Sequence, residues 1–146
     1  KGEGKANVSR SGDLALRVYS FGFLAFELTS QDGAISSNPA IDRNKGVILT
    51  YGLRDCLFWW DIEDSSIDEQ DNAYVFSNSI RSIWIDKATM LPQKQTISLS
   101  DGRELLITYE RPQQIGGNWY PSRIRIQLSR YAVILVIKEL SFILDA

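Results

Sequence analysis

The sequence contains no histidine, only one cysteine and no long apolar run. Without histidine, the commonest general base and the commonest zinc ligand are both missing, so Ser-His-Asp triads, Cys-His pairs and histidine metal sites are excluded. A lone cysteine, Cys56, cannot form a disulfide within the chain, so the hydrophobic core must stabilise the fold. No stretch approaches the roughly 20 apolar residues of a membrane-spanning helix, and we expect a water-soluble body.

An excess of positive charge is also missing. The formal net charge is −2, and a nucleic acid is therefore disfavoured as a partner, because the chain has no surplus of cations to neutralise phosphates. No Gly-x-Gly-x-x-Gly follows a strand and no Gly-Lys-Ser/Thr occurs, so nucleotide-dependent enzymes are not supported. We expect neither a cofactor nor a metal.

Carboxylates are the remaining source of catalytic chemistry. Folding could bring two of them to the separation of about 5–10 Å that glycosidases use. With 18 acidic residues such coincidences are frequent, so we interpret them as surface charges and predict that the chain is not an enzyme. The acidic stretch 64–72 lacks the ligand pattern of a calcium loop and is predicted to be a solvated loop. The candidate carboxylates are Asp61, Glu63, Asp64, Glu104 and Glu110.

What the chain does contain is typical of one globular β domain. Its 146 residues, of which 44% are hydrophobic, can bury one sizeable core. In the second half, short alternating runs separated by turn residues predict an antiparallel meander. Asp101-Gly102 supplies the positive φ angles of a tight hairpin turn. The predicted strands lie near 79–86, 93–100, 103–110, 120–128 and 131–142.

Two segments of this meander have distinct patterns. The stretch 111–121 is rich in proline and glycine, and we predict that it is a hairpin loop. The run 131–137 is apolar at every position, which predicts a strand covered on both faces.

The first half predicts further strands and one helix. Strands are expected near 7–9, 14–19 and 23–29, which would bring the total to eight or nine. Leu53, Cys56, Leu57 and Trp60 follow the i, i+3, i+4, i+7 spacing of an amphipathic helix over about 53–62. The sequence Phe-Trp-Trp at 58–60 points large rings in different directions around such a helix, so an exposed aromatic there would mark a binding surface.

Three short motifs of the second half follow one another in a defined order. Residues 83–92 are IWIDKATMLP, Asp101-Gly102 comes next, and residues 119–124 are WYPSRI. An Ile-Asp-x-x-Thr-x-x-Pro strand end, an Asp-Gly hairpin and a Tyr-Pro-x-x-Ile strand start have this order in the LolA/LolB-like lipoprotein-sorting superfamily. The chain resembles that family over about residues 80–146, and the run 14–22 (LALRVYSFG) resembles its early strand.

The resemblance implies a mainly β fold of the α+β class: a curved antiparallel sheet that forms an incomplete β-barrel, with one or more short helices covering its concave side. It also implies a non-catalytic protein that holds lipid or the acyl chains of lipoproteins in an apolar cavity, in transport or in outer-membrane anchoring. The location would be periplasmic or outer-membrane-anchored, with envelope proteins and peripheral membrane contact as further partners. Residues 1–146 would be a single domain without the family's N-terminal helix and first strand, after removal of an upstream segment.

Alternation and helix spacing select the candidate cavity residues, because the family has no short lipid-contact motif to carry over. Each acyl methylene moved from water into such a cavity gains about 0.8 kcal/mol, so a dry groove suffices to hold a lipid. The candidates are Phe23, Phe26, Leu28, Leu57, Trp60, Ile97, Leu99, Ile107 and Ile126.

Other functions stay open at this point. A structural or interaction module of an envelope assembly would have a filled core and an exposed aromatic patch near Trp59 or Trp119. A lipocalin-like carrier would close the barrel fully with eight up-and-down strands. The lipid-binding hypothesis instead predicts a continuous apolar cavity under the helix at 53–62.

Overall fold

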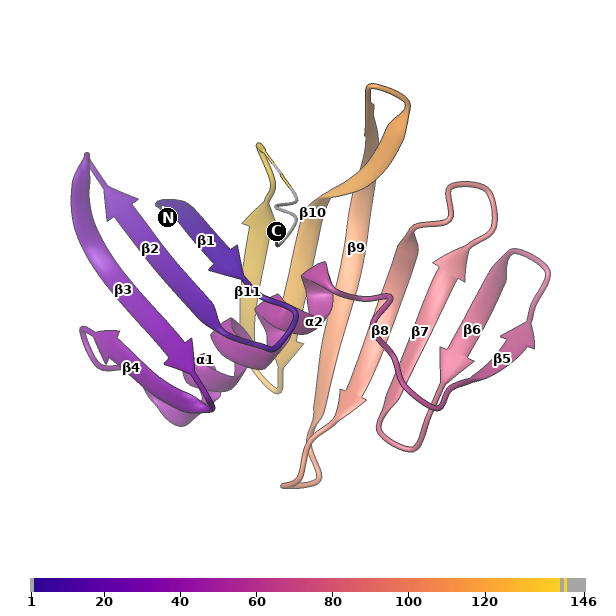
Figure 1. Cartoon of the computed structure of the whole chain (residues 1–146), viewed down its shortest axis with the longest axis horizontal. Helices are drawn as coiled ribbons and strands as arrows, with labels where there is room; N and C mark the ends of the chain where they lie inside the picture. The colour runs from indigo at the N-terminus through magenta and orange to yellow at the C-terminus, as the bar shows by residue number, and fades with distance from the viewer. Residues whose placement is uncertain (1, 140, 142–146) are drawn as a thin grey trace. The chain divides into compact units, whose positions relative to one another are not determined.

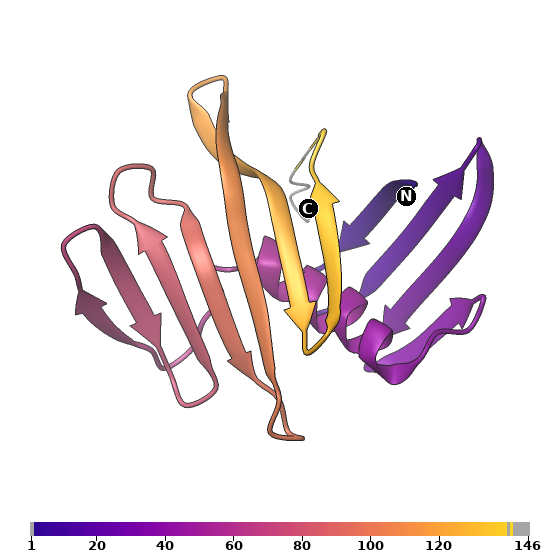
Figure 2. The ribbon, with the colours of Figure 1, turned by 180° about the vertical axis from the view of Figure 1, so that it is seen from behind.

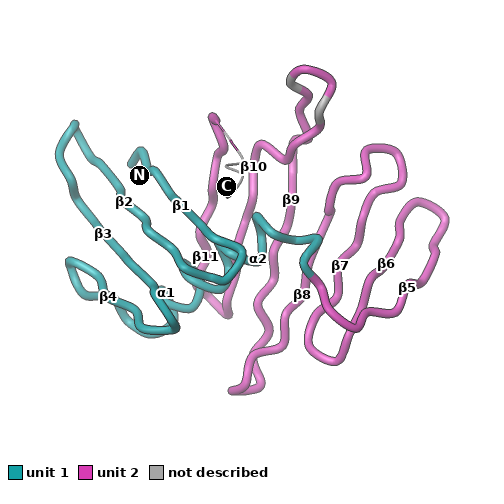
Figure 3. Tube along the Cα trace, in the orientation of Figure 1, with its two compact units in different colours: residues 1–61 teal, residues 62–146 magenta. Residues whose placement is uncertain are grey.

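The computed structural model describes residues 2–139 and 141. It divides into two compact units, an N-terminal unit (Lys1–Asp61) and a C-terminal unit (Ile62–Ala146) (Figure 3). Over the described residues the chain is mainly β, with a four-stranded and a seven-stranded sheet and one helical segment (Figure 1). The predicted mainly β, antiparallel class is therefore confirmed.

The N-terminal unit begins with an antiparallel meander. Its strands are β1 (Glu3–Val8), β2 (Leu14–Ser20), β3 (Phe23–Gln31) and β4 (Ala34–Asn38), and each pairs with the next along the chain. Leu16 of β2 lies opposite Leu28 of β3, and both are buried. Because side chains alternate along a strand, the sheet has one apolar face around this pair and one face that carries Arg17 and Glu27.

A helical segment follows this sheet. It consists of α1 (Arg43–Val47), the π-helical turn η1 (Ile48–Gly52) and α2 (Leu53–Leu57). The predicted limits of 53–62 are wrong at both ends, because Asp42 caps the helix by accepting a hydrogen bond from the Lys45 N–H, and Phe58 leaves the helical conformation with φ −102° and ψ 46°. No helix among the described residues has the length and hydropathy to cross a membrane.

Arg54 attaches the end of this helix to the turn between β1 and β2. Its guanidinium donates to the backbone carbonyl of Arg10 at 3.1 Å and pairs with Asp61 at 3.0 Å. Arg10 also pairs with Asp61, so the carboxylate holds two guanidinium groups. Asp61 therefore has a structural partner set, and its candidacy as a catalytic carboxylate has no support.

The C-terminal unit is a single antiparallel meander in which strand order follows the sequence (Figure 1, Figure 2). One face of this sheet is largely polar and carries Lys94, Thr108 and Arg125, which are in register on three neighbouring strands. The apolar face includes Ile107 and Ile126, which lie opposite each other and are fully buried. The strands are β5 (Ser66–Glu69), β6 (Ala73–Ser77), β7 (Arg81–Asp86), β8 (Pro92–Ser98), β9 (Glu104–Ile115), β10 (Asn118–Leu128) and β11 (Tyr131–Val136).

Three predictions for this half differ from the structure. Part of the acidic stretch 64–72 forms β5, whose exposed charges are typical of an edge strand. Because β4, β5 and β6 were not predicted, the described residues form eleven strands instead of eight or nine. The segment 111–121 is mostly strand: Pro112 pairs with Pro121, and the turn is confined to Gly116-Gly117. One face of β11 is exposed, with Ile134 and Val136 open to solvent, so this strand is not covered on both sides.

The hairpin predicted at Asp101-Gly102 is confirmed, although only Gly102 and not Asp101 has a positive φ. Gly102 has φ 83°, and the turn is closed by hydrogen bonds from the Gly102 N–H to the Leu99 carbonyl and from the Leu99 N–H to the Arg103 carbonyl. Both strands that it joins match their predicted positions within a few residues, apart from the longer end of β9.

Gly102→Ala is expected to lower the free energy of unfolding by about 1 kcal/mol. A Cβ there would meet no other atom within 4 Å, so the cost comes from the positive φ alone. Urea denaturation would measure this, with Gly102→Asn as the control, because asparagine tolerates the left-handed conformation. An equal loss in both variants would contradict the backbone explanation.

Candidate functional site

The predicted cavity residues of the N-terminal unit lie in different environments. Leu28 is fully buried, and Phe26 is half-buried on the same face of β3. Phe23 is 78% exposed at the start of that strand. Leu57 is the last residue of α2, and Trp60 lies beyond the helix with 45% of its surface exposed. The helical spacing that linked Trp60 to Leu57 is not realised, because the helix has already ended.

The rings at 58–60 form a small cluster instead. Trp60 packs edge to face against Phe58, with ring centroids 5.6 Å apart, and against Trp59 at 5.5 Å. The three rings thus cover part of one another's surface, and Trp60 is the most exposed of them.

The candidates of the C-terminal unit are closer to the prediction. Ile97, Ile107 and Ile126 share one face of the neighbouring strands β8, β9 and β10, and all are buried. Leu99 lies just beyond the end of β8 and is half-buried in the Asp-Gly turn. That these residues and those of the N-terminal unit line one cavity stays a prediction.

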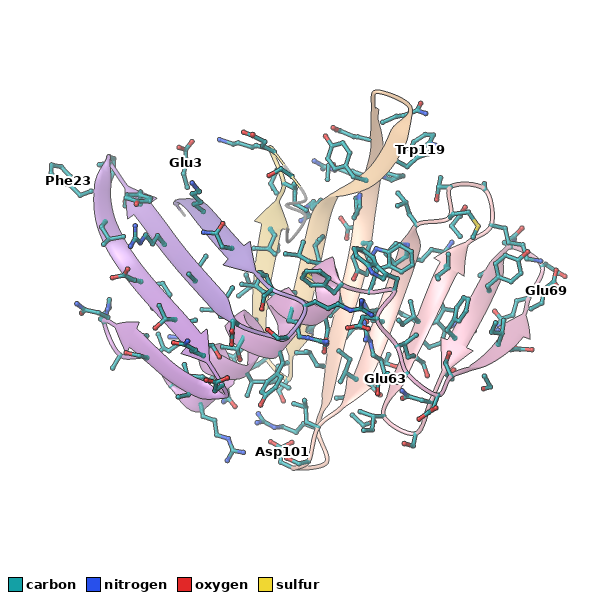
Figure 4. All side chains as sticks on the ribbon, in the orientation of Figure 1. Glu3, Phe23, Glu63, Glu69, Asp101 and Trp119 are labelled. Carbon is teal, nitrogen blue, oxygen red and sulfur yellow. The ribbon has the colours of Figure 1, made fainter. Side chains whose placement is uncertain are left out.

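Among the described residues, the two most exposed large apolar side chains, Phe21 and Phe23, lie at the turn between β2 and β3, and the sequence analysis selected only Phe23. Phe21 is 97% exposed, and Figure 4 shows Phe23 projecting from the end of the hairpin. Leu24 and Tyr19 are also exposed. We call Tyr19, Phe21, Phe23 and Leu24 the aromatic tip.

The backbone of this turn makes Phe21 an unusual choice. Ser20 pairs with Phe23, so the turn consists of Phe21 and Gly22, with φ of 51° and 81°. Two positive φ angles define a type I′ turn, which favours Asn-Gly. A bulky side chain in this conformation costs about 1–2 kcal/mol, and at this exposure no packing offsets the cost. The tetrapeptide Ser-Phe-Gly-Phe, an aromatic where a turn needs asparagine, is the sequence signal that could have located the site.

A β-bulge makes the tip apolar on both sides. Val18 pairs with Phe26 but Tyr19 pairs with Leu24, so Ala25 is an extra residue in β3. Paired residues share a face and successive residues alternate, so Tyr19 and Leu24 lie on one face while Phe23 lies on the other. Both faces of the hairpin end are therefore apolar, apart from the hydroxyl groups of Tyr19 and Ser20.

The two strands of the hairpin carry no charge at the tip, and the neighbouring strand β1 places Glu3 opposite Tyr19. No residue from 18 to 26 is charged, and the next residue on each strand is Arg17 or Glu27. These two lie opposite each other, with Arg17 Nε 3.0 Å from Glu27 Oε1. Hydrogen bonding to Glu27 raises the pKa of the Arg17 guanidinium.

The C-terminal unit contains a small cleft. Its volume is about 220 Å³, and its walls include three prolines. Asp86, at its edge, accepts hydrogen bonds from the backbone N–H groups of Thr89 and Ala88 and from the Gln93 side chain, which hold the pKa of Asp86 below its ordinary value. Glu110, also in the wall, pairs with Arg123. Both carboxylates have structural roles.

Asp86→Ala is expected to lower the urea midpoint at neutral pH and to matter less in acid. Because the folded-state pKa is depressed, the ionised carboxylate stabilises the turn above its ordinary pKa of about 3.9, and this stabilisation is lost as the pH falls through the folded value. The difference in free energy of unfolding between wild type and variant should therefore be constant above about pH 5 and narrow as the pH falls below about 4. The exposed Asp68 of β5, replaced by alanine, is the control, and a gap independent of pH would contradict the prediction.

Other reactive groups are scarce among the described residues. Cys56 is buried, burial raises the pKa of its thiol, and an apolar protonated thiol of this kind is unreactive. Over the same part of the chain, no three or more Cys, Asp or Glu side chains are grouped so as to hold a metal ion.

Comparisons of this chain with protein-family models, with curated proteins and with solved structures found no match. The resemblance inferred from the motifs at 83–92, 101–102 and 119–124 therefore stays a prediction.

Proposed function

We propose that this chain is a non-catalytic lipid-binding protein of the bacterial cell envelope that contacts the membrane surface through its aromatic tip. The observation that carries the proposal is the exposure of Phe21 and Phe23 at the end of a charge-free hairpin. Local stability favours another residue at position 21, and side chains that break a local rule are expected at functional sites. A lipid surface would bury these rings without requiring a large complementary protein surface.

The size of the tip suits reversible contact. Full burial of a phenylalanine side chain gains about 1.5–3 kcal/mol, so Phe21 and Phe23 together supply about 3–6 kcal/mol. A single myristoyl chain likewise gives only marginal, reversible binding. Such an affinity fits a protein that visits a membrane to collect or deliver a lipid or an acyl chain.

The motif resemblance extends this proposal to cargo and location. It supports an incomplete barrel with helices over its concave side, an apolar cavity for lipid or lipoprotein acyl chains, and a periplasmic or outer-membrane-anchored protein. The buried apolar face of the seven-stranded sheet, around Ile107 and Ile126, is compatible with such a cavity wall.

The membrane contact is tested by flotation with phosphatidylcholine vesicles. Phe21→Ser/Phe23→Ser should reduce the bound fraction at least about tenfold, because both anchoring rings are lost. Ile67→Ser is the matched control, because it removes an exposed aliphatic side chain from β5 without touching the tip. Wild-type protein that fails to float, or a double variant that floats equally well, would refute the proposal.

Cargo binding is tested separately. Native mass spectrometry of the purified protein, together with displacement of a fluorescent fatty acid, should reveal a bound lipid or a saturable site. Trp60→Asp should weaken probe binding if Trp60 lines the cavity. Because Trp60 is partly exposed, the variant is expected to remain folded. A folded protein that carries no lipid and binds no probe would remove the carrier role and leave the membrane contact standing.

One observation favours a second candidate function, an interaction module of an envelope assembly. The β9–β10 hairpin extends past the neighbouring strands of its unit, and Trp119 near its end is 44% exposed (Figure 1, Figure 4). Exposed aromatics anchor protein interfaces. This candidate gains support if vesicle flotation and lipid analysis are both negative.

A further inference from the structure

We infer that the aromatic tip selects the apolar interior of a lipid surface and is indifferent to the charge of the headgroups. The inference rests on the proposed function and specifies the kind of membrane that the tip fits. A zwitterionic surface would be bound as well as an anionic one, which separates this protein from peripheral proteins that are recruited by electrostatics.

The charges nearest the tip cancel. Arg17 lies opposite Glu27 on one side and opposite Lys5 on the other, and Glu3 lies opposite Tyr19. These residues contribute two positive and two negative charges around the base of the tip. Proteins that recognise anionic lipids instead carry clusters of 4–8 Lys or Arg, each worth about 1 kcal/mol near the surface. Among the described residues of this hairpin and of β1, no such cluster is present.

Glu3 and the Arg17–Glu27 pair also limit how deep the hairpin can enter. At about 3.3 Å per residue, Phe21 lies about 13 Å along the strand from Arg17. Interfacial apolar segments enter about 5–10 Å into the boundary between headgroups and acyl chains. Glu3 of β1 lies opposite Tyr19, about 7 Å along the strand from Phe21, so the charge-free depth falls within this range. The Glu3 carboxylate and the Arg17–Glu27 pair then stay at the level of headgroups and water, where they need no desolvation.

The shape of the tip argues for a lipid rather than a protein as the occupant. A stable protein interface buries about 800 Å² on each partner, usually around a central aromatic cluster with a polar rim. The tip is instead the narrow end of the β2–β3 hairpin, which β1 reaches only at Tyr19. The bulge at Ala25 makes both faces of this end apolar. A bilayer surrounds an inserted hairpin on all sides and so covers both faces at once.

The experiment compares vesicles of pure phosphatidylcholine with vesicles containing about 30% phosphatidylglycerol, each at about 50 and 500 mM salt, conditions that change the screening length severalfold. We expect wild-type flotation to agree within about twofold across all four conditions and to be lost in Phe21→Ser/Phe23→Ser. Flotation that requires phosphatidylglycerol and disappears at high salt would overturn the inference while leaving membrane binding intact. Absence of flotation in every condition would overturn the proposed function itself.

Depth is measured with single cysteine labels, which the buried Cys56 allows, since it should not react in the folded protein. An environment-sensitive fluorophore on Ala25→Cys should shift its emission to the blue with either vesicle type. The same fluorophore on the exposed Thr29→Cys, beyond Glu27, should not shift. Equal shifts at both positions would contradict the depth limit set by Glu3 and the Arg17–Glu27 pair.

A second copy of the chain is the competing occupant. Sedimentation velocity of wild type and of Phe21→Ser/Phe23→Ser decides this case. A dimer that forms with rising concentration and is lost in the double variant would show that the tip is a protein interface, and it would overturn the inference. A monomer in both would agree with a lipid surface as the occupant.

Discussion

Phe21→Asn is expected to make the protein more stable and at the same time to weaken vesicle binding at least about tenfold. Asparagine tolerates the φ of 51° at this position far better than phenylalanine, so the folded state should gain about 0.5–1 kcal/mol. The 97% exposed ring has no intramolecular packing whose loss would offset this gain. Binding should fall because the ring that enters the lipid is removed.

Thermal unfolding of Phe21→Asn would measure the expected gain in stability, and flotation of the same variant would measure the expected loss of vesicle binding. Phe23→Ser is the control, because Phe23 does not have a positive φ: it should lose binding without the gain in stability. If Phe21→Asn destabilises the protein, the ring has a structural role that its exposure does not suggest. If the variant is more stable and binds vesicles like wild type, the unfavourable turn residue has no functional explanation in lipid binding.

Ile107→Ala is expected to lower the free energy of unfolding by about 2–5 kcal/mol, the range for truncating a fully buried aliphatic side chain. Ile107 lies on a central strand, opposite Gln95 on one side and Ile126 on the other, and all three are fully buried. Its loss removes the transfer free energy of the deleted methyl groups and leaves a void that flanking strands cannot easily close.

The adjacent Thr108 supplies the control for this prediction. It lies on the opposite face of β9 and is only half-buried, so Thr108→Ala should cost less than about 1 kcal/mol. Equal losses in the two variants, measured by urea unfolding, would show that the two faces of this sheet do not differ in burial. If Ile107 instead lines an occupied lipid cavity, added fatty acid should raise the midpoint of wild type more than that of Ile107→Ala.

Local patterns explain why much of the second half was predictable. Asp101-Gly102 indicates a turn by itself, because glycine readily adopts the positive φ that Gly102 has in the structure. The alternation around Ile124 and Ile126 predicts which side chains of the strand are buried, because a one-residue slip in register would expose all of them. These signals act between neighbours in the sequence, so no tertiary information is needed to interpret them.

The errors arose where distant partners decide the outcome. Proline and glycine at 111–121 indicate a loop, yet Pro112 and Pro121 pair across β9 and β10, where Arg111 with φ 53° bends the strand. The acidic residues at 66–69 become a strand only because β6 offers a pairing partner. Trp60 left the predicted helix because Phe58 ended it. In the first two cases hydrogen bonding between distant segments overrode the local preference.

The sequence by itself determined the antiparallel β class, the meander of the second half and the absence of histidine chemistry, because alternation, turn residues and composition are local or global properties of the chain. Only the tertiary structure decided that Phe21 and Phe23 are exposed together at a hairpin end. Their aromatic character alone favours a place in the core. The two-residue turn and the bulge at Ala25 instead carry them beyond the last paired charges, where no other part of their sheet can cover them.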